Sequence, residues 1–113
     1  MKKILIIGNA GAGKTTFARK LSQMTKIPLT HLDKLFWCGE WEHISRDEFD
    51  VLLDEVLSKD EWIIDGNFNR TLPKRLMHCD TVFFFDFSGF SLYYTEKEAA
   101  YGRGYKFSNK KQR

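Results

Sequence analysis

A glycine-rich stretch close to the N-terminus constrains this chain more than any other segment. Residues 8–15 read Gly-Asn-Ala-Gly-Ala-Gly-Lys-Thr and match the pattern G-x-x-x-x-G-K-[ST] at every fixed position. Residues 4–7, a short apolar run typical of a buried parallel strand, come directly before it. Apolar residues at helical spacing, beginning with Phe17, come after it. The sequence therefore predicts a strand, a glycine loop and a helix in succession.

This succession is suited to binding phosphate groups. The glycines allow the backbone to turn its N–H groups inward, and the helix N-terminus adds partial positive charge. Lys14 would supply a point charge for the β- and γ-phosphates of a nucleoside triphosphate, and the Thr15 hydroxyl would be a ligand for Mg²⁺. The predicted nucleotide-binding residues are Gly8, Asn9, Ala10, Gly11, Ala12, Gly13, Lys14, Thr15 and Thr16.

Length and composition indicate a single globular domain. The chain has 113 residues, of which 42% are hydrophobic and 29% charged, values that are ordinary for a soluble protein. No apolar run approaches the roughly 20 residues that cross a bilayer, so we expect a cytoplasmic protein with no membrane partner. Cys38 and Cys79 are isolated in the sequence, which disfavours a metal site built from thiolates.

The net charge of +3 arises at the C-terminal end. The last twelve residues hold five Lys or Arg and no acid. We therefore expect a nucleotide-binding domain over residues 1–101 and a flexible basic tail over residues 102–113. Such a tail is most often a solvated terminus, and its alternative role is contact with nucleic acid or an acidic partner.

Strands and helices are predicted to alternate along the rest of the chain. We expect further strands over residues 29–33, 62–65 and 81–86. The clearest helix signal is the capping box of Ser45 and Glu48, which precedes an apolar stripe of helical period. Alternation of this kind predicts an α/β fold with three layers, in which helices flank a short parallel sheet of about four strands.

Two acidic residues near the carboxyl ends of these strands are candidates for chemistry, because ligands of parallel sheets bind at that edge. Asp65 would hold Mg²⁺ opposite Thr15, or alternatively form a cap or turn before Gly66. Asp33 would accept a proton or a hydrogen bond from an acceptor hydroxyl, or alternatively cap the segment that begins at Lys34. These alternatives remain open from the sequence alone.

Phosphoryl transfer also requires positive charge near the moving phosphate and near an anionic acceptor. Arg70, shortly after the strand that ends in an acid, is the first candidate, and Lys74 and Arg75 on the following helix are the next. The three histidines have no partner at a telling spacing, so ordinary structural roles are expected for them. The predicted catalytic residues are Lys14, Asp33 and Arg70, and the predicted metal ligands are Thr15 and Asp65.

With these residues laid out, the chain resembles the adenylate-kinase-like P-loop kinases, and more narrowly the bacterial DNA topology modulation proteins. The likeness is carried by residues 1–19, by His-Leu-Asp-Lys-Leu-Phe-Trp at 31–37, by Trp-Ile-Ile-Asp-Gly-Asn at 62–67 and by residues 80–87. The resemblance implies a P-loop NTPase fold that binds ATP and Mg²⁺, with Asp65 serving the metal. It also implies phosphoryl transfer from ATP to a nucleotide or other small acceptor.

The resemblance ends at about residue 87. Members of the family usually continue with a proline-arginine turn and an arginine-rich helix and lid, whereas Ser-Gly-Phe-Ser follows here at residues 88–91. We therefore expect a shortened or frame-shifted copy in which catalysis is impaired more than nucleotide binding, with an open sheet edge that invites a homodimer. The alternatives are a nucleotide-binding regulatory module that contacts DNA or a protein partner without catalysis, and a remnant whose folding is impaired.

Overall fold

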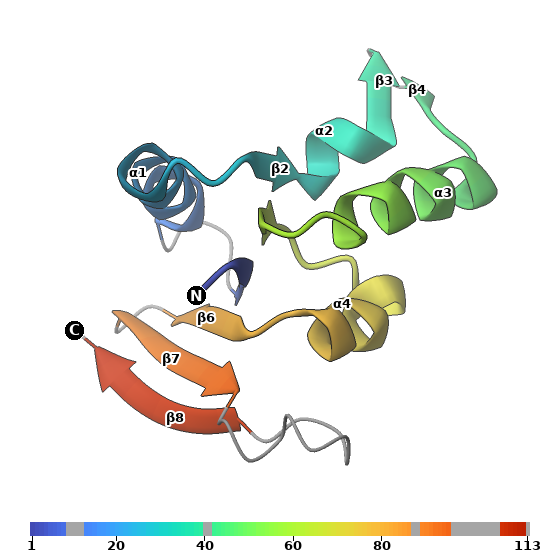
Figure 1. Cartoon of the computed structure of the whole chain (residues 1–113). Coiled ribbons are helices and arrows are strands. Elements are labelled where there is room, and N and C mark those ends of the chain that lie inside the picture. The colour runs from blue at the N-terminus through green and yellow to red at the C-terminus, as the bar shows by residue number, and fades with distance from the viewer. Residues whose placement is uncertain (9–12, 40–41, 87–88, 96–106, 113) are drawn as a thin grey trace.

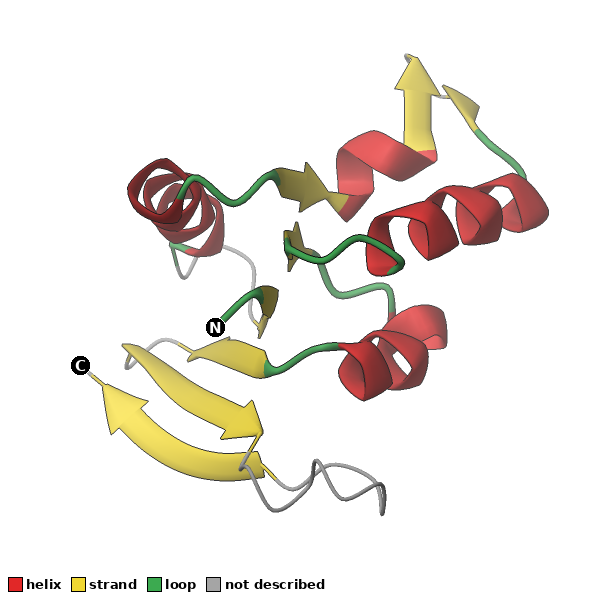
Figure 2. Ribbon diagram, in the orientation of Figure 1, coloured by secondary structure: helices red, strands yellow, loops and turns green. Residues whose placement is uncertain are grey.

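The computed structural model describes residues 1–8, 13–39, 42–86, 89–95 and 107–112. In these ranges the chain forms a six-stranded sheet in the order β2-β5-β1-β6-β7-β8, with helices on both faces (Figures 1 and 2). The parallel strands are β1 (Lys3–Gly8), β2 (Leu29–His31), β5 (Trp62–Asp65) and β6 (Thr81–Asp86). The antiparallel strands that follow are β7 (Gly89–Thr95) and β8 (Phe107–Gln112). The predicted α/β class is therefore confirmed.

The central strand β1 is apolar on both faces because helices cover both. Ile4 and Ile6 belong to a cluster on the side of α1 (Lys14–Thr25). Leu5 and Ile7 belong to a second cluster, on the side of α3 (Arg46–Leu57) and α4 (Leu72–His78). Since side chains alternate across a strand, one continuous apolar run contributes to two cores, and the expected three layers result.

Local backbone and side-chain contacts set the end of α1 and the start of α3. The first helix stops at Thr25, where Lys26 adopts the left-handed conformation and donates its N–H to the carbonyl of Ser22 at 2.8 Å. At the start of α3 the Ser45 hydroxyl accepts the backbone N–H of Glu48 at 3.1 Å, as expected for a capping residue. None of the helices in the described ranges has the length and apolar character needed to cross a bilayer.

The segment after β2 differs from the sequence expectation. The strand predicted over residues 29–33 ends at His31, and a short helix, α2 (Leu32–Phe36), begins at once. Leu32 is fully buried in the same cluster as Phe49, so burial of this side chain fixes where the strand gives way to helix. The chain then forms a small antiparallel pair, β3 (Trp37–Gly39) and β4 (Glu42–His43).

The sheet also continues beyond the four parallel strands that we expected. Strand β7 covers the edge of β6, and Phe90 packs against Phe17, Phe83 and Phe85 with ring centroids 5.3, 5.5 and 5.3 Å apart. Part of the expected basic tail, residues 107–112, forms β8 and pairs with β7. The rest of that expected tail, residues 102–106 and 113, lies outside the described residues. The edge strands of the described sheet are therefore β2 and β8, and a homodimer through an open edge stays a prediction.

The two faces of β6 provide a test of this packing. Phe83 and Phe84 are neighbours, but 6% of Phe83 is exposed against 41% of Phe84. Phe83→Ala empties space beneath α1 and is expected to lower the free energy of unfolding by about 3–5 kcal/mol. Phe84→Ala, the matched control, should lower it by about 1 kcal/mol or less. Urea unfolding measures both variants, and equal losses would contradict the assignment of faces.

Candidate functional site

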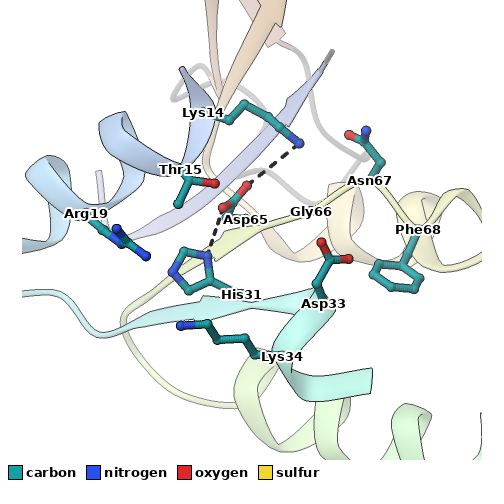
Figure 3. Close-up of a pocket in the computed structure, with 10 residues that line it drawn as sticks. All are labelled: Lys14, Thr15, Arg19, His31, Asp33, Lys34, Asp65, Gly66, Asn67 and Phe68. Carbon is teal, nitrogen blue, oxygen red and sulfur yellow. Dashed lines mark hydrogen bonds and ion pairs between the residues drawn. The ribbon is translucent and has the colours of Figure 1, made fainter. Parts of the chain in front are cut away.

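A cavity of about 420 Å³ lies at the carboxyl ends of β2 and β5, beside the start of α1 (Figure 3). Ligands of parallel α/β sheets bind at this edge. The cavity is lined by Lys14, Thr15, Arg19, His31, Asp33, Lys34, Asp65, Gly66, Asn67 and Phe68. Four of the residues that we selected from the sequence, Lys14, Thr15, Asp33 and Asp65, thus come together in one place. The roles assigned to them remain predictions.

The glycines that flank the predicted phosphate loop adopt conformations suited to glycine. Gly8 has a φ of 128°, and a Cβ there would lie 2.1 Å from the carbonyl oxygen of Phe85 on the neighbouring strand. Gly13 has a φ of 88° and forms the N-cap of α1, and as a glycine it has no side chain to accept a hydrogen bond from the first N–H groups. A helix start without a side-chain cap offers these N–H groups to an anion.

The remaining residues of the predicted nucleotide site are placed as follows. Thr16 lies in the first turn of α1 and is exposed, but it does not line the cavity. The other four predicted loop residues lie outside the described residues; they are Asn9, Ala10, Gly11 and Ala12.

Asp65 is the centre of the charged contacts in the cavity. Its side chain is 7% exposed; one carboxylate oxygen lies 2.9 Å from His31 Nδ1 and the other lies 3.9 Å from Lys14 Nζ. A buried carboxylate requires polar or charged partners, and α1 and β2 each supply one here. No local pattern in the sequence indicates the role of His31, because its partner is far along the chain and is brought close only by the β2–β5 register.

The oxygen donors of the cavity fit a magnesium ion bound together with nucleotide phosphates. Mg²⁺ is usually held by one or two carboxylates, with phosphates and waters as its other ligands. Asp65 lies beside the start of α1, and Thr15 carries a hydroxyl in the first turn of that helix. Asp33 adds a second carboxylate to the lining. These are the residues that would hold the ion.

The carboxylate of Asp33 is available for chemistry. His31, rather than Asp33, is the N-cap of α2, so the alternative in which Asp33 caps a helix from Lys34 is not what the structure shows. Asp33 is exposed to the cavity, and its carboxylate makes no hydrogen bond or ion pair within the described ranges. A carboxylate of this kind can accept a proton from a bound molecule.

Asn67 ties the loop after β5 to the glycine-rich segment. Its Oδ1 accepts the backbone N–H of Gly8 at 3.0 Å, and its Nδ2 donates to the carbonyl oxygen of Gly8 at 2.9 Å. This reciprocal pair of hydrogen bonds joins the loop after β5 to the last residue of β1. We did not select Asn67 as a site residue, although an amide directly after Asp-Gly at the end of a parallel strand was a usable signal.

Arg70 is not brought together with Lys14 and Asp65. Its guanidinium donates to both carboxylate oxygens of Asp50 on α3, at 2.7 and 3.2 Å. This hydrogen bonding lowers the pKa of Asp50 and raises the pKa of Arg70. Lys74 likewise forms an ion pair with Asp54 on α3. A catalytic role for Arg70 on the moving phosphate therefore remains a prediction.

A second cavity, of about 310 Å³, adjoins the first because Phe68 lines both. Its walls combine aromatic rings with two arginines, Arg46 and Arg70. The rings of Phe36 and His43 are stacked, with centroids 4.6 Å apart and an interplanar angle of 8°. Rings and guanidinium groups together suit a flat molecule that carries an anionic group.

Two further cations line the first cavity, and we did not select them from the sequence. Arg19 lies one helical turn after Thr15 on α1, and Lys34 lies in α2 (Figure 3). Neither side chain forms an ion pair or a hydrogen bond with another residue that the structure describes. With Lys14 they give the cavity three cations against two carboxylates, a balance that favours an anionic ligand.

Comparison with known proteins gives a limited match. No protein-family model matches the chain. Two curated relatives are the SPbeta prophage-derived sublancin-168-processing and transport ATP-binding protein SunT of Bacillus subtilis (strain 168) and the sublancin-168-processing and transport ATP-binding protein sunT of Bacillus phage SPbeta. Each is 40% identical over 58 residues, which cover 47% of this chain and 8% of the relative. The resemblance to adenylate-kinase-like kinases and DNA topology modulation proteins therefore rests on the motifs alone.

Two glycines of the site give a matched test of local geometry. Gly66 has a φ of 148°, and a Cβ there would lie 2.8 Å from Leu32 Cβ, whereas a Cβ on Gly13 would meet nothing within 4 Å. Gly66→Ala adds a clash to backbone strain and should lower the free energy of unfolding by about 2–4 kcal/mol. Gly13→Ala should cost about 1–2 kcal/mol from strain alone. Thermal unfolding compares the two variants. Equal losses of free energy of unfolding would contradict the predicted clash, because they would mean that the Leu32 side chain moves aside for the added methyl group.

Proposed function

We propose that the chain binds ATP with Mg²⁺ and transfers the terminal phosphoryl group to a nucleotide or other small acceptor. The observation that carries the proposal is the convergence of Lys14 and Asp65 at the start of α1, directly after the glycine-rich segment. The partial match to proteins named as ATP-binding supports the binding step. The motif resemblance to adenylate-kinase-like kinases and DNA topology modulation proteins supports the transfer step.

The phosphates of the donor would lie against the N-terminus of α1. There the backbone N–H groups, the partial charge of the helix and the Lys14 ammonium all favour negative charge. Lys14 Nζ lies 3.9 Å from Asp65, beyond hydrogen-bond distance, so its donors are free to turn toward a phosphate. When bound, Mg²⁺ would supply charge neutralisation of the phosphates, with Asp65 and Thr15 as its protein ligands.

The transfer step requires a proton acceptor, and Asp33 is placed to serve as one. The bond between the γ-phosphorus and its bridging oxygen breaks, ADP leaves with that electron pair, and a new bond forms from phosphorus to the acceptor oxygen. If the acceptor is a hydroxyl, its proton would pass to the carboxylate of Asp33, which lines the cavity without a competing partner in the described ranges.

The acceptor would occupy the second cavity and reach the first past Phe68, which lines both. The stacked rings of Phe36 and His43 would contact a flat base or ring. Arg46 and Arg70 would contact an anionic group, because guanidinium groups bind phosphate and carboxylate through two hydrogen bonds. In this arrangement Arg70 acts on the acceptor rather than on the moving phosphate.

Binding is tested by isothermal titration calorimetry with Mg·ATP. Lys14→Ala removes a charged donor to the phosphates and should weaken binding by about tenfold to a hundredfold. Lys20→Ala is the matched control, since Lys20 is exposed on the same helix and does not line the cavity. We expect it to bind like the wild type. A wild-type protein that binds no Mg·ATP, or a Lys14→Ala variant that binds equally well, would show the assignment to be wrong.

Transfer is tested by phosphorus NMR of Mg·ATP with a mixture of nucleosides and nucleoside monophosphates. The wild type should produce ADP and a new phosphoester signal only when an acceptor is present. For a hydroxyl acceptor, Asp33→Asn should lower kcat by about 10²-fold or more, because it removes the proton acceptor. Asp60→Asn, in the exposed turn after α3 and away from the linings of both cavities, should leave kcat unchanged. Binding of ATP without turnover of any acceptor would favour the regulatory alternative.

A further inference from the structure

Arg75, on α4, is fully buried although it carries a charged side chain. Its Nε donates to Thr71 Oγ1 at 3.2 Å, and Nη1 donates to the carbonyl oxygen of Gly66 at 2.9 Å. Its Nη2 donates to the carbonyl oxygens of Asn67 and Phe68, the latter at 3.0 Å. Each of these acceptors is neutral, and no carboxylate of the described ranges forms an ion pair with Arg75.

Burial of a guanidinium without a carboxylate partner costs desolvation free energy. The groups that Arg75 contacts therefore indicate its role. Burial lowers the pKa of Arg75 to about 10, which still leaves the side chain charged at neutral pH. Three of its hydrogen bonds go to the carbonyl groups of three successive residues, 66–68. Because the guanidinium donors form a rigid planar fork, they fix the relative orientation of these peptide groups.

Two of the residues whose carbonyl groups Arg75 contacts, Gly66 and Phe68, have uncommon backbone conformations. Gly66 has a φ of 148°, and Phe68 has a φ of 27° with a ψ of 73°. A positive φ at a bulky residue is strained and persists only where the surrounding structure enforces it. The hydrogen bonds from Arg75 to both residues provide that enforcement.

Two of these three residues, Asn67 and Phe68, carry side chains that line the first cavity. Asn67 forms the reciprocal hydrogen bonds with Gly8, where the glycine-rich segment begins. Phe68 lines the first cavity and the second. A continuous series of contacts therefore leads from Arg75, through the carbonyl groups of residues 66–68, to the backbone of Gly8.

We propose that Arg75 is a positioning residue of the nucleotide site, whose guanidinium holds residues 66–68 so that Asn67 keeps its two hydrogen bonds with Gly8 at the start of the glycine-rich segment. The effect on nucleotide binding rests on the proposed function. The pair of hydrogen bonds between Asn67 and Gly8 is a property of the protein without a ligand. A merely structural role would stabilise the whole fold and would have no particular effect on Gly8.

The first test is hydrogen exchange of individual backbone amides, followed by NMR in the ligand-free protein. Arg75→Lys keeps the charge but loses the fork, and should make the Gly8 amide exchange about tenfold faster relative to the Leu5 amide on the same strand. Asn67→Ala should have at least the same effect, and the double variant should be no faster than Asn67→Ala alone. Unchanged relative exchange in Arg75→Lys would overturn the proposal.

A matched control separates positioning from stability. Leu57 is buried on α3 and lines neither cavity, so Leu57→Ala should destabilise the fold without making the Gly8 amide exchange faster relative to the Leu5 amide. If Arg75→Lys does not fold, Thr71→Val removes the acceptor of Nε together with the hydrogen bond that the Thr71 hydroxyl donates to the carbonyl oxygen of Phe68. That milder variant should also accelerate the Gly8 amide selectively, and its failure to do so would count against the proposal.

The second test measures the Kd for Mg·ATP in the same variants. Arg75→Lys should weaken binding about tenfold, and its effect should not add to that of Asn67→Ala, because both act through the same contact. Leu57→Ala should bind like the wild type. If the wild type binds no Mg·ATP, the proposed function fails while the exchange of Gly8 still decides the role of Arg75. If the wild type binds and Arg75→Lys binds equally well, Arg75 does not position the nucleotide site.

Discussion

The parallel register of β1, β2 and β5 decides where the side chains of the candidate site lie. Ile6 on β1 and His31 on β2 are both placed opposite Asp65 on β5. Because α1 follows β1 after the glycine-rich segment, Lys14 at the start of α1 lies near the same carboxylate. One buried carboxylate thus has two partners, His31 from β2 and Lys14 from α1.

The sequence predicted the fold best where the signal is local. The capping residue Ser45, the apolar stripe of α3 and the apolar runs of β1, β5 and β6 depend on neighbouring residues, and all appear as expected. The end of β2 was misjudged because burial of Leu32 against distant residues, rather than local pattern, starts α2. We did not predict β7 or β8, although the Phe, Tyr and Thr residues of β7 favour a strand; their pairing joins segments that are separated along the chain.

The same division applies to the site. A motif encodes spacing along the chain, so Lys14, Thr15 and Asp65 could be selected from that spacing and from the apolar runs beside them. It does not encode the partner across a sheet, so the contact of His31 with Asp65 and that of Asn67 with Gly8 escaped notice. Arg75 was considered as a candidate for positive charge near the phosphate or the acceptor, whereas its side chain turns inward to backbone carbonyl groups.

The most direct measurement is a crystal structure with Mg²⁺ and a non-hydrolysable ATP analogue. The account predicts that the β- and γ-phosphates lie at the N-terminus of α1, with Lys14 Nζ on a phosphate oxygen and Mg²⁺ between the phosphates and the side chains of Thr15 and Asp65. The reciprocal hydrogen bonds of Asn67 with Gly8 should persist. A nucleotide bound elsewhere, or a start of α1 without an anion at saturating analogue, would contradict the central claim.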